Sequence, residues 1–418
     1  MNATRSKDRV DFVVLNDLHP EEYPGAATIA FEIAQKLSEC FLTEYWCATS
    51  KGYSGPGTKS KYLKIIKIRY RKRAIAIFYK FNLTKLFHEL FNPVAYIWFV
   101  TKLLKTRPRI LWMHQIGGVF PWFIVWFAKA LKVTTVLTLH DFTLVYPGKV
   151  YPKDVGTESF EIDDYCNTTR VKEAINESQG TSRVFKRFFR IRRCLLRRTI
   201  NKVDLVIAIS ELQSNILIGF GFKKLKIINN GVLPCNCKAT KEVRIKNSKP
   251  KILFAGRAIG KGLERISYAV AKTKCTVLVL AGPPELVTIA SRVLPRSRIE
   301  YLGQLTRNNM FREIHKVQAV AVLSDCLDVF PTMTLEALAH GALVLTTPNT
   351  GNSFYSRFTS QAISISSSKT EKLLISVLDQ LENAGTENFL DEQFCSSLRT
   401  PSVVLEEVLV ELRRFFSN

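Results

Sequence analysis

The chain has 418 residues, of which 46% are hydrophobic, so it is long enough for two or three domains with cores that need no disulfide or metal staple. Its formal net charge is +24, and about +19 of this charge falls within residues 1–240. A basic half attracts phosphate groups at long range, whether they belong to anionic lipid, lipid-linked sugar diphosphates, nucleic acid or a nucleotide. Charge alone does not choose among these partners.

Nine cysteines are scattered without regular spacing, and the pair Cys235 and Cys237 has no second pair at metal-ligand distance. We therefore expect reduced thiols in a cytoplasmic protein. The first residues lack the apolar stretch of a secretory leader. The nearest candidate for a membrane span is Gly117–Val133, but it contains Lys129 and Lys132, and we interpret it as a buried helix.

Apolar runs typical of buried strands alternate with helix-like segments in the first part of the chain. The expected strands are Val10–Leu15, Tyr62–Ile68, Ile110–His114, Thr134–Leu139 and Asp204–Ile209, and the expected helices include Thr28–Leu37 and Pro121–Leu131. This alternation predicts a parallel sheet covered by helices. The acidic, turn-rich segment Lys149–Gly180 is interpreted as an excursion from this domain.

The same pattern occurs a second time after a polar, lysine-rich stretch. The expected strands are Lys251–Phe254, Cys275–Ala281, Ile299–Leu302, Ala319–Leu323 and Leu343–Thr346, and the expected helices are Gly262–Thr273 and Thr332–His340. We divide the chain into an N-terminal domain (residues 1–238), a linker (239–250) and a C-terminal domain (251–402). The apolar spacing of Val403–Phe416 predicts a helix, and we expect residues 403–418 to return to the first domain.

We expect two doubly wound α/β domains that face each other across a cleft. Ligands of such sheets bind beyond the carboxyl ends of the strands. Motifs that directly follow a strand are therefore the functional candidates. In the segment from Ala255 to Gly262, Arg257 and Lys261 precede a helix. Their charges, the backbone donors and the helix dipole suit a diphosphate, although an ordinary turn with exposed cations explains them equally well.

The segment from Ser324 to Gly341 also follows a strand. Asp328 lies in the expected loop, and Glu336 lies about one turn into a mostly apolar helix. Carboxylates placed beside the N–H groups of a helix start can accept hydrogen bonds from sugar hydroxyls or from a ribose. The alternative is that Asp328 caps a turn and Glu336 is solvated, which the apolar neighbours of Glu336 disfavour.

The spacing of Asp328 and Glu336, with Phe330, Pro331 and Gly341, resembles the Glu-x7-Glu signature of the retaining family 4 glycosyltransferases. Further similarities follow in the family's order: Pro24-Gly25-Ala26-Ala27, Thr138-Leu139-His140-Asp141, Ile209-Ser210-Glu211 and Ile228-Asn229-Asn230-Gly231-Val232. Each motif is weak, and the ordered set is specific. Asp328 stands where the family has Glu, and Pro348–Asn352 lacks the family's Gly-Gly-x-x-Glu.

The resemblance implies the GT-B fold and a role for each residue. Arg257 and Lys261 would neutralise the donor diphosphate, with Gly25 letting backbone approach the phosphates. Glu336 would hold the ribose and Asp328 the donor-sugar hydroxyls. The backbone of Phe330, Pro331 and Thr332 would face the sugar, and His140 would lie near its primary hydroxyl. No Asp-x-Asp motif ends a strand, so we expect no metal and no cofactor beyond the nucleotide-sugar substrate.

The segment Arg183–Arg198 predicts a basic amphipathic helix, since Val184, Phe188, Ile191 and Leu195 share one face. A solvated helix packed on its own domain explains the pattern too. We favour peripheral binding to the anionic inner face of a membrane. The acceptor would then be a glycan or a lipid-linked glycan, in synthesis of a cell-envelope polysaccharide or glycolipid.

Three other functions compete with this interpretation. A GT-B nucleotide-sugar epimerase would use the same diphosphate site without an acceptor. A basic nucleic-acid-binding protein would account for the charge, but the sequence contains no helix-turn-helix, zinc-finger or RNP pattern. A glycosyltransferase-like scaffold without catalysis would account for the altered loops.

Overall fold

The computed structural model describes residues 10–20, 25–49, 62–69, 89–145, 183–223, 225–232, 249–256, 260–365, 370–384, 394 and 397–416. These residues fall into two compact units. The first comprises Met1–Pro147, Ser182–Asn230 and Pro401–Asn418, and the second comprises Gly148–Thr181 and Gly231–Thr400. Most of the expected linker, Arg257 and the expected excursion Lys149–Gly180 lie outside the described residues.

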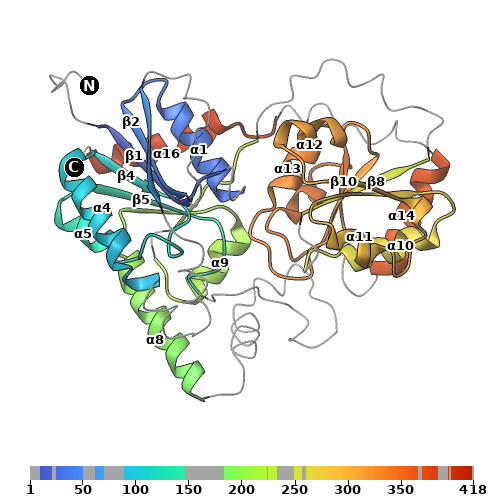
Figure 1. Ribbon diagram of the computed structural model, residues 1–418, viewed down its shortest axis with the longest axis horizontal. Coiled ribbons are helices and arrows are strands. Elements are labelled where there is room, and N and C mark those ends of the chain that lie inside the picture. Colours follow the sequence, from blue (N-terminus) through green and yellow to red (C-terminus); the bar gives the residue numbers. More distant parts are fainter. Residues whose placement is uncertain are drawn as a thin grey trace. The chain divides into compact units, whose positions relative to one another are not determined.

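The first unit contains one parallel sheet with helices on both faces (Figure 1). Its strands run in the order β3-β2-β1-β4-β5-β6-β7. They are β1 Phe12–Leu18, β2 Thr43–Thr49, β3 Leu63–Arg69, β4 Ile110–Met113, β5 Thr134–Leu139, β6 Leu205–Ala208 and β7 Leu225–Ile227. The helices are α1 Ala26–Leu37, α4 Pro93–Thr106, α5 Ile124–Ala130, α8 Arg183–Ile200, α9 Glu211–Gly219 and α16 Pro401–Phe416.

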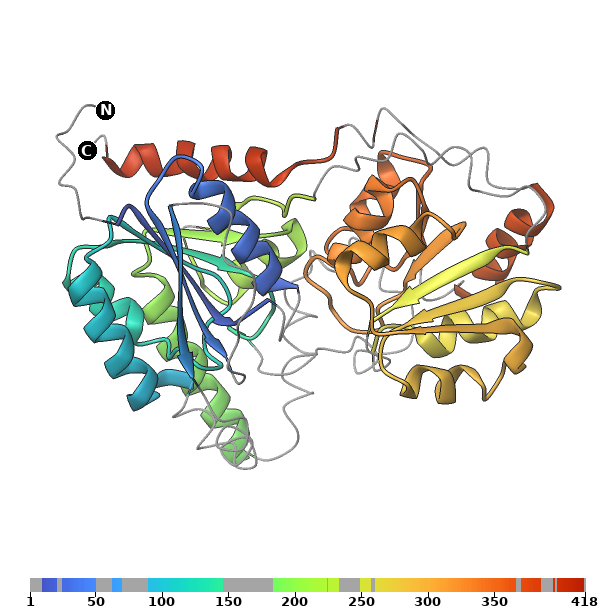
Figure 2. The same ribbon diagram turned by 45° about the horizontal axis from the view of Figure 1, so that its top comes forward.

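Alternate side chains of these strands point to opposite faces, as expected for a sheet that is covered on both sides. Phe12, Val14 and Trp112 contribute to a buried cluster with α1. The C-terminal helix α16 completes this cluster through Val404, Leu405, Val408 and Leu412. The last helix of the chain therefore belongs to the core of the first unit (Figure 2).

The second unit has a parallel sheet in the order β10-β9-β8-β11-β12-β13. The strands are β8 Lys251–Ala255, β9 Val277–Ala281, β10 Ile299–Gly303, β11 Ala319–Val322, β12 Leu343–Thr346 and β13 Ala362–Ser364. The helices are α10 Leu263–Lys272, α11 Glu285–Ala290, α12 Arg307–Ile314, α13 Thr332–Ala339 and α14 Thr370–Ala384, with short 3-10 turns η2 Arg296–Arg298 and η3 Ser353–Arg357.

Two buried clusters lie on the two faces of this second sheet. Ile252 and Phe254 face α10, α11 and α14, whereas Leu253 faces α12 and α13. Both sheets thus have the strand order of dinucleotide-binding folds, and the predicted α/β class with two doubly wound, parallel-sheet domains is confirmed. Among the described residues, no helix is both long and apolar enough to cross a bilayer.

A close approach of backbone to backbone shapes the second unit at Gly262. This residue has φ +78°, and a Cβ there would lie 2.1 Å from the carbonyl oxygen of Leu323 at the end of β11. Only glycine fits both the left-handed conformation and the contact. The turn from β8 into α10 therefore packs directly on the loop after β11.

We expect Gly262→Ala to lower the free energy of unfolding by about 3 kcal/mol, because it combines left-handed strain with a steric clash. The matched control is Gly303→Ala, since Gly303 has φ +70° but no atom within 4 Å of its Cβ position. That control should lose only about 1 kcal/mol. Denaturant unfolding measures both, and equal losses would contradict the close contact.

Candidate functional site

The candidate site of the second unit lies where the strand order reverses. β8 and β11 are neighbours in the sheet, and the chains that leave their carboxyl ends run to α10 and α13. Such a switch point leaves a crevice beyond the strand ends, where doubly wound sheets bind ligands. Lys261 follows β8, and the loop that carries Asp328 follows β11.

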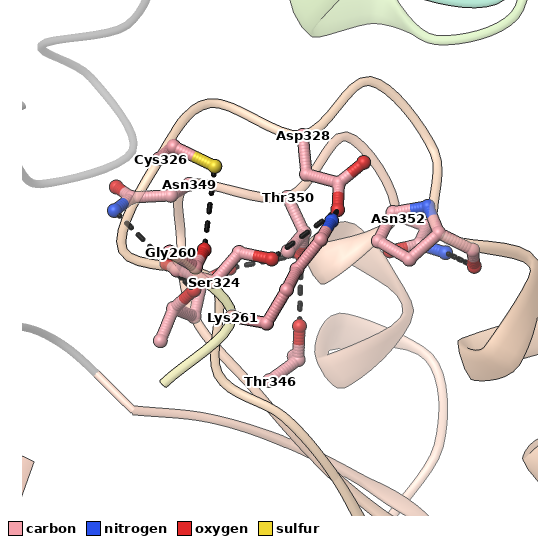
Figure 3. Close-up of polar contacts among 11 residues, drawn as sticks. Gly260, Lys261, Ser324, Cys326, Asp328, Thr346, Asn349, Thr350 and Asn352 are labelled. Carbon is pink, nitrogen blue, oxygen red and sulfur yellow. Dashed lines mark hydrogen bonds and ion pairs between the residues drawn. The ribbon is translucent and has the colours of Figure 1, made fainter. Parts of the chain in front are cut away.

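Lys261 and Asp328 form an ion pair across this switch point. The Nζ atom of Lys261 donates to Oδ2 of Asp328, and the hydroxyl of Ser324 donates to the same oxygen at 3.2 Å (Figure 3). The side chains are 33% and 18% exposed, so both remain accessible to a ligand. The structure thus brings together two residues that are 67 positions apart in the sequence.

The backbone of Asp328 is fixed by the loop that follows β12. The N–H of Asp328 donates to the carbonyl of Asn349, and the N–H of Gly351 donates to the carbonyl of Asp328, both at 2.8 Å. The hydroxyls of Thr346 and Thr350 lie 2.8 Å apart beneath this bridge. Because the main chain is held on both sides, the carboxylate projects from a rigid support (Figure 3).

The segment Phe330–Thr332 leads from this loop into α13. Phe330 is buried, Pro331 is the residue before the helix, and Thr332 is its first residue. The Nδ2 atom of Asn352 donates to the carbonyl of Pro331 at 2.8 Å, which fixes the start of the helix. α13 therefore begins four residues after Asp328, with the N–H groups of its first turn at the end of this loop.

Glu336 lies further along α13 and is only 8% exposed. Its Oε1 atom accepts a hydrogen bond from Nε of Arg307, the first residue of α12, at 3.0 Å. Burial raises the pKa of the Glu336 carboxyl above its ordinary value, and the positive charge of Arg307 opposes this rise. Sequence reasoning missed Arg307, since its only local signal is a cation directly after Thr306, the capping residue of the helix.

The first unit has a second group of polar residues at its own switch point, between β1 and β4. Asp17 is the sixth residue of β1, and its carboxylate accepts the N–H groups of Gly118, Val119 and Phe120 at 2.6, 3.0 and 2.8 Å. Burial raises the pKa of Asp17 to about 7 despite these donors. Asp17 was not a sequence candidate, although a polar Asn16-Asp17 pair at the end of an apolar run is a signal for one.

His140 follows β5 in the same unit and stacks on His114, which follows β4. The ring centroids are 5.2 Å apart, and Nδ1 of His114 lies 2.9 Å from Nε2 of His140. Burial lowers the pKa of His140 to about 4 and, together with His140, lowers the pKa of His114 well below its ordinary value. Both rings are therefore neutral at physiological pH, so His140 can donate or accept a hydrogen bond without a charge.

Gly25 stands immediately before α1 in the first unit. Its φ of +98° and ψ of −116° are open only to glycine, and no atom of the described residues lies within 4 Å of its Cβ position. The backbone of Gly25 is therefore not covered by a side chain of its own, and its approach to a ligand stays a prediction. Gly25 and His140 belong to the first unit, whereas Lys261, Asp328, Glu336 and Phe330–Thr332 belong to the second.

Two family models match consecutive parts of the chain. Glycosyltransferase Family 4 matches residues 25–234, and Glycosyl transferases group 1 matches residues 238–388. A comparison with proteins of curated function finds no match in sequence.

Several solved structures have a similar fold. Sucrose-phosphate synthase from Thermosynechococcus elongatus superposes with a TM-score of 0.70 at 14% identity, covering 97% of this chain and 99% of the other. HepE from Anabaena, in complex with UDP-glucose, gives 0.62 at 12% identity, covering 96% and 99%. WaaG, a glycosyltransferase involved in lipopolysaccharide biosynthesis, gives 0.62 at 14%, covering 95% and 98%.

These findings define a glycosyltransferase with the GT-B fold, built from two Rossmann-like domains. The chain belongs to Glycosyltransferase Family 4, whose model spans half of it. The enzyme class and the family predicted from the ordered motifs are confirmed. The roles of the individual residues stay predictions.

The buried histidine pair predicts how stability depends on pH. Because the pKa of His140 is about 4 in the fold and 6.5 as its ordinary value, the unfolded chain binds more protons between these pH values. Stability from the neutral ring is present above about pH 6.5 and is lost as the pH falls towards 4. In His140→Gln, the drop in unfolding free energy between pH 7 and pH 5 should be smaller by about 2 kcal/mol.

Asp17→Asn provides a control of opposite sign for this measurement. The pKa of Asp17 is raised to about 7 in the fold, so the folded state binds the extra proton between pH 3.8 and 7. Wild-type Asp17 therefore adds stability as the pH falls, and its replacement should make the acid-side loss steeper. Urea unfolding of wild type, His140→Gln and Asp17→Asn at pH 7 and pH 5 tests both predictions. An equal drop in unfolding free energy for the three proteins would contradict them.

Proposed function

We propose that this glycosyltransferase moves a sugar from a nucleotide-sugar donor to a sugar or lipid-linked acceptor with retention of configuration. The observation that carries the donor class is the cation of Lys261, held against Asp328 at the switch point of the second unit. A diphosphate carries more negative charge than one carboxylate, so it competes successfully for Lys261. The binding of UDP-glucose by HepE supports a donor of this type.

The proposed chemistry assigns each residue a separate task. The bond between the anomeric carbon and the diphosphate oxygen breaks, and the electron pair leaves with the diphosphate. Lys261, with Arg257, stabilises the charge that develops there. Asp328 accepts hydrogen bonds from donor-sugar hydroxyls, Glu336 holds the ribose, and His140 contacts the primary hydroxyl. The acceptor hydroxyl oxygen forms the new bond to the anomeric carbon, and its proton passes to the departing diphosphate.

This donor site predicts a specific binding pattern. In a thermal-shift panel of UDP-, GDP-, ADP- and dTDP-sugars with EDTA present, one nucleotide class should raise the Tm of the wild-type protein. Lys261→Ala should weaken that donor about tenfold or more, since it removes one charge-assisted contact to the diphosphate. Asp328→Asn should bind the free nucleoside diphosphate more tightly, because it removes the competing carboxylate, and should lose transfer.

Lys251→Ala is the matched control, since Lys251 begins the strand β8 whose other end leads to Lys261. It forms its own ion pair with Glu300 and should leave donor affinity unchanged. If Lys261→Ala and Lys251→Ala bind the donor as the wild type does, the proposed site is wrong. A donor shift that disappears in EDTA contradicts the metal-independent mechanism.

We further propose that the enzyme works as a peripheral protein on an anionic membrane surface, as part of cell-envelope polysaccharide or glycolipid synthesis. The helices α4, α5 and α8 are neighbours in the first unit (Figure 1). They contain lysines and arginines but neither aspartate nor glutamate, and Lys129 of α5 is paired with Asp204 of the adjoining loop. Such a surface is complementary to anionic headgroups.

Exposed apolar side chains accompany these cations. Val94 and Ile97 on α4 are 71% and 63% exposed, and Leu104 lies further along the same helix at 43%. On α8, Arg190 and Ile191 are exposed, whereas Arg192 is buried in an ion pair with Glu89. Part of the basic pattern of α8 is therefore structural, and the exposed remainder with the apolar stripe of α4 is typical of interfacial binding.

This surface predicts charge-dependent lipid binding. Reversing two exposed cations of α8, in Arg190→Glu/Arg197→Glu, should reduce binding to vesicles containing phosphatidylglycerol by about tenfold or more, since each basic residue contributes roughly 1 kcal/mol. The control is Arg292→Glu/Arg296→Glu, which reverses two exposed cations of the second unit. Sedimentation with vesicles measures both, and equal losses would contradict a surface on α4, α5 and α8.

A further inference from the structure

The contact between α12 and α13 consists of specific polar and aromatic side-chain pairs, and not only of apolar packing. Arg307 and Phe311 of α12 and its C-terminal capping residue His315 follow each other at intervals of four residues, as do Glu336 of α13 and its capping residue His340. Residues at this interval lie on one face of a helix. Arg307 pairs with Glu336, whereas Phe311 and His315 both contact His340.

The first of these contacts is the ion pair of Arg307 and Glu336. Arg307 donates from Nε to Oε1 of Glu336 at 3.0 Å, and the two side chains are 24% and 11% exposed. The guanidinium carbon of Arg307 also lies 5.4 Å from the ring centroid of Phe311, one turn further along α12. The guanidinium is therefore held from two sides, which fixes its direction towards Glu336.

The side chains beyond this ion pair contact one another rather than Glu336. The ring of Phe311 stacks on His340 at a centroid distance of 4.4 Å, and Nδ1 of His340 lies 2.9 Å from Nε2 of His315. Burial and the neighbouring His315 and Arg307 lower the pKa of His340 to about 4. The strands β11 and β12 that α13 covers carry no ionisable side chain. Arg307 is thus the charged partner that the structure gives Glu336.

A carboxylate at this depth needs such a partner if it is to remain an anion. Glu336 is almost fully buried on an apolar helix, and removal of a carboxylate from water favours its protonated form. Arg307 occupies Oε1, and an ionised carboxylate can accept about four hydrogen bonds, so acceptor sites remain at Oε2. A pair of adjacent hydroxyl groups is the ligand that such a half-paired carboxylate suits.

We propose that Arg307 is a positioning residue that keeps Glu336 ionised and turned to accept the ribose hydroxyls of the donor, so that the enzyme selects ribonucleotide over deoxyribonucleotide donors. This inference rests on the proposed function, because it concerns the nucleotide end of the same donor site. Arg307 acts through Glu336. Its effect is confined to ligands that carry a ribose.

The test uses two substitutions with opposite charge outcomes. Arg307→Gln removes the positive charge, whereas Arg307→Lys keeps it. In Arg307→Gln the carboxyl of Glu336 protonates at higher pH, so affinity for UDP should fall as the pH is lowered from 8.5 to 6.5. Calorimetric titration should give a loss of about tenfold at pH 6.5 that largely disappears at pH 8.5. Wild type and Arg307→Lys should show no such change.

Two further ligands and one further variant separate the possible outcomes. Pyrophosphate lacks the ribose, so Arg307→Gln should bind it as wild type does, and 2′-deoxy-UDP should bind wild type more weakly than UDP. Lys251→Gln breaks an ion pair elsewhere in the same unit and should change none of these values. A loss of UDP affinity in Arg307→Gln that is equal at both pH values, or equal for pyrophosphate, means a structural role and overturns the inference.

The binding of UDP and pyrophosphate by Lys261→Ala and Arg307→Gln distinguishes failure of this inference from failure of the proposed donor site. If Lys261→Ala weakens both UDP and pyrophosphate while Arg307→Gln binds UDP normally at each pH, only the role of Arg307 is wrong. If Lys261→Ala leaves both ligands unaffected, the donor site itself is wrong, and the role of Arg307 is wrong with it.

Discussion

The contact between Gly262 and the carbonyl of Leu323 is the constraint on which the candidate site of the second unit depends. It joins the turn after β8 to the loop after β11 at a distance that no side chain permits. The backbone of Lys261, immediately before Gly262, is therefore held beside the loop of Asp328, within reach of the lysine side chain. The ion pair follows from backbone packing, and its position relative to the start of α13 is fixed before any ligand binds. Preorganised charges of this kind lose little entropy when they meet a substrate.

The fold could be predicted from the sequence because its determinants are local. Buried parallel strands are short apolar runs, and Ile110–His114 and Thr134–Leu139 agree with β4 and β5 to within a residue. β1 runs from Phe12 to Leu18 rather than from Val10 to Leu15, since the polar Asn16-Asp17 pair conceals its end. β2 was missed because Glu44 interrupts its apolar pattern, and that carboxylate is accommodated by the indole N–H of Trp46 at 2.8 Å.

The candidate site was predictable only in its motifs. Lys261, Asp328 and Glu336 stand in segments that follow strands, so their spacing is visible in one dimension. The residues that support the site could not be predicted in this way. Arg307 is 29 positions from Glu336 and contacts it from the neighbouring helix. Likewise, Asp17 binds the N–H groups of a loop that begins 101 positions later. Side chains that act on distant backbone leave no periodic signal, so only the packed structure reveals them.

The C-terminal helix α16 has a consequence for the order in which the protein is made. Leu405 and Val408 complete the same cluster as Ile29 and Ile33 of α1, so the first unit includes the last turns of the chain. During synthesis, the whole second unit leaves the ribosome before this part of the first core can close. The part of α1 that packs on α16 stays uncovered until residues 401–416 are made, while the second unit, whose segments are all available earlier, can fold first. The N-terminal domain is thus the earlier one to be synthesised and the later one to be finished.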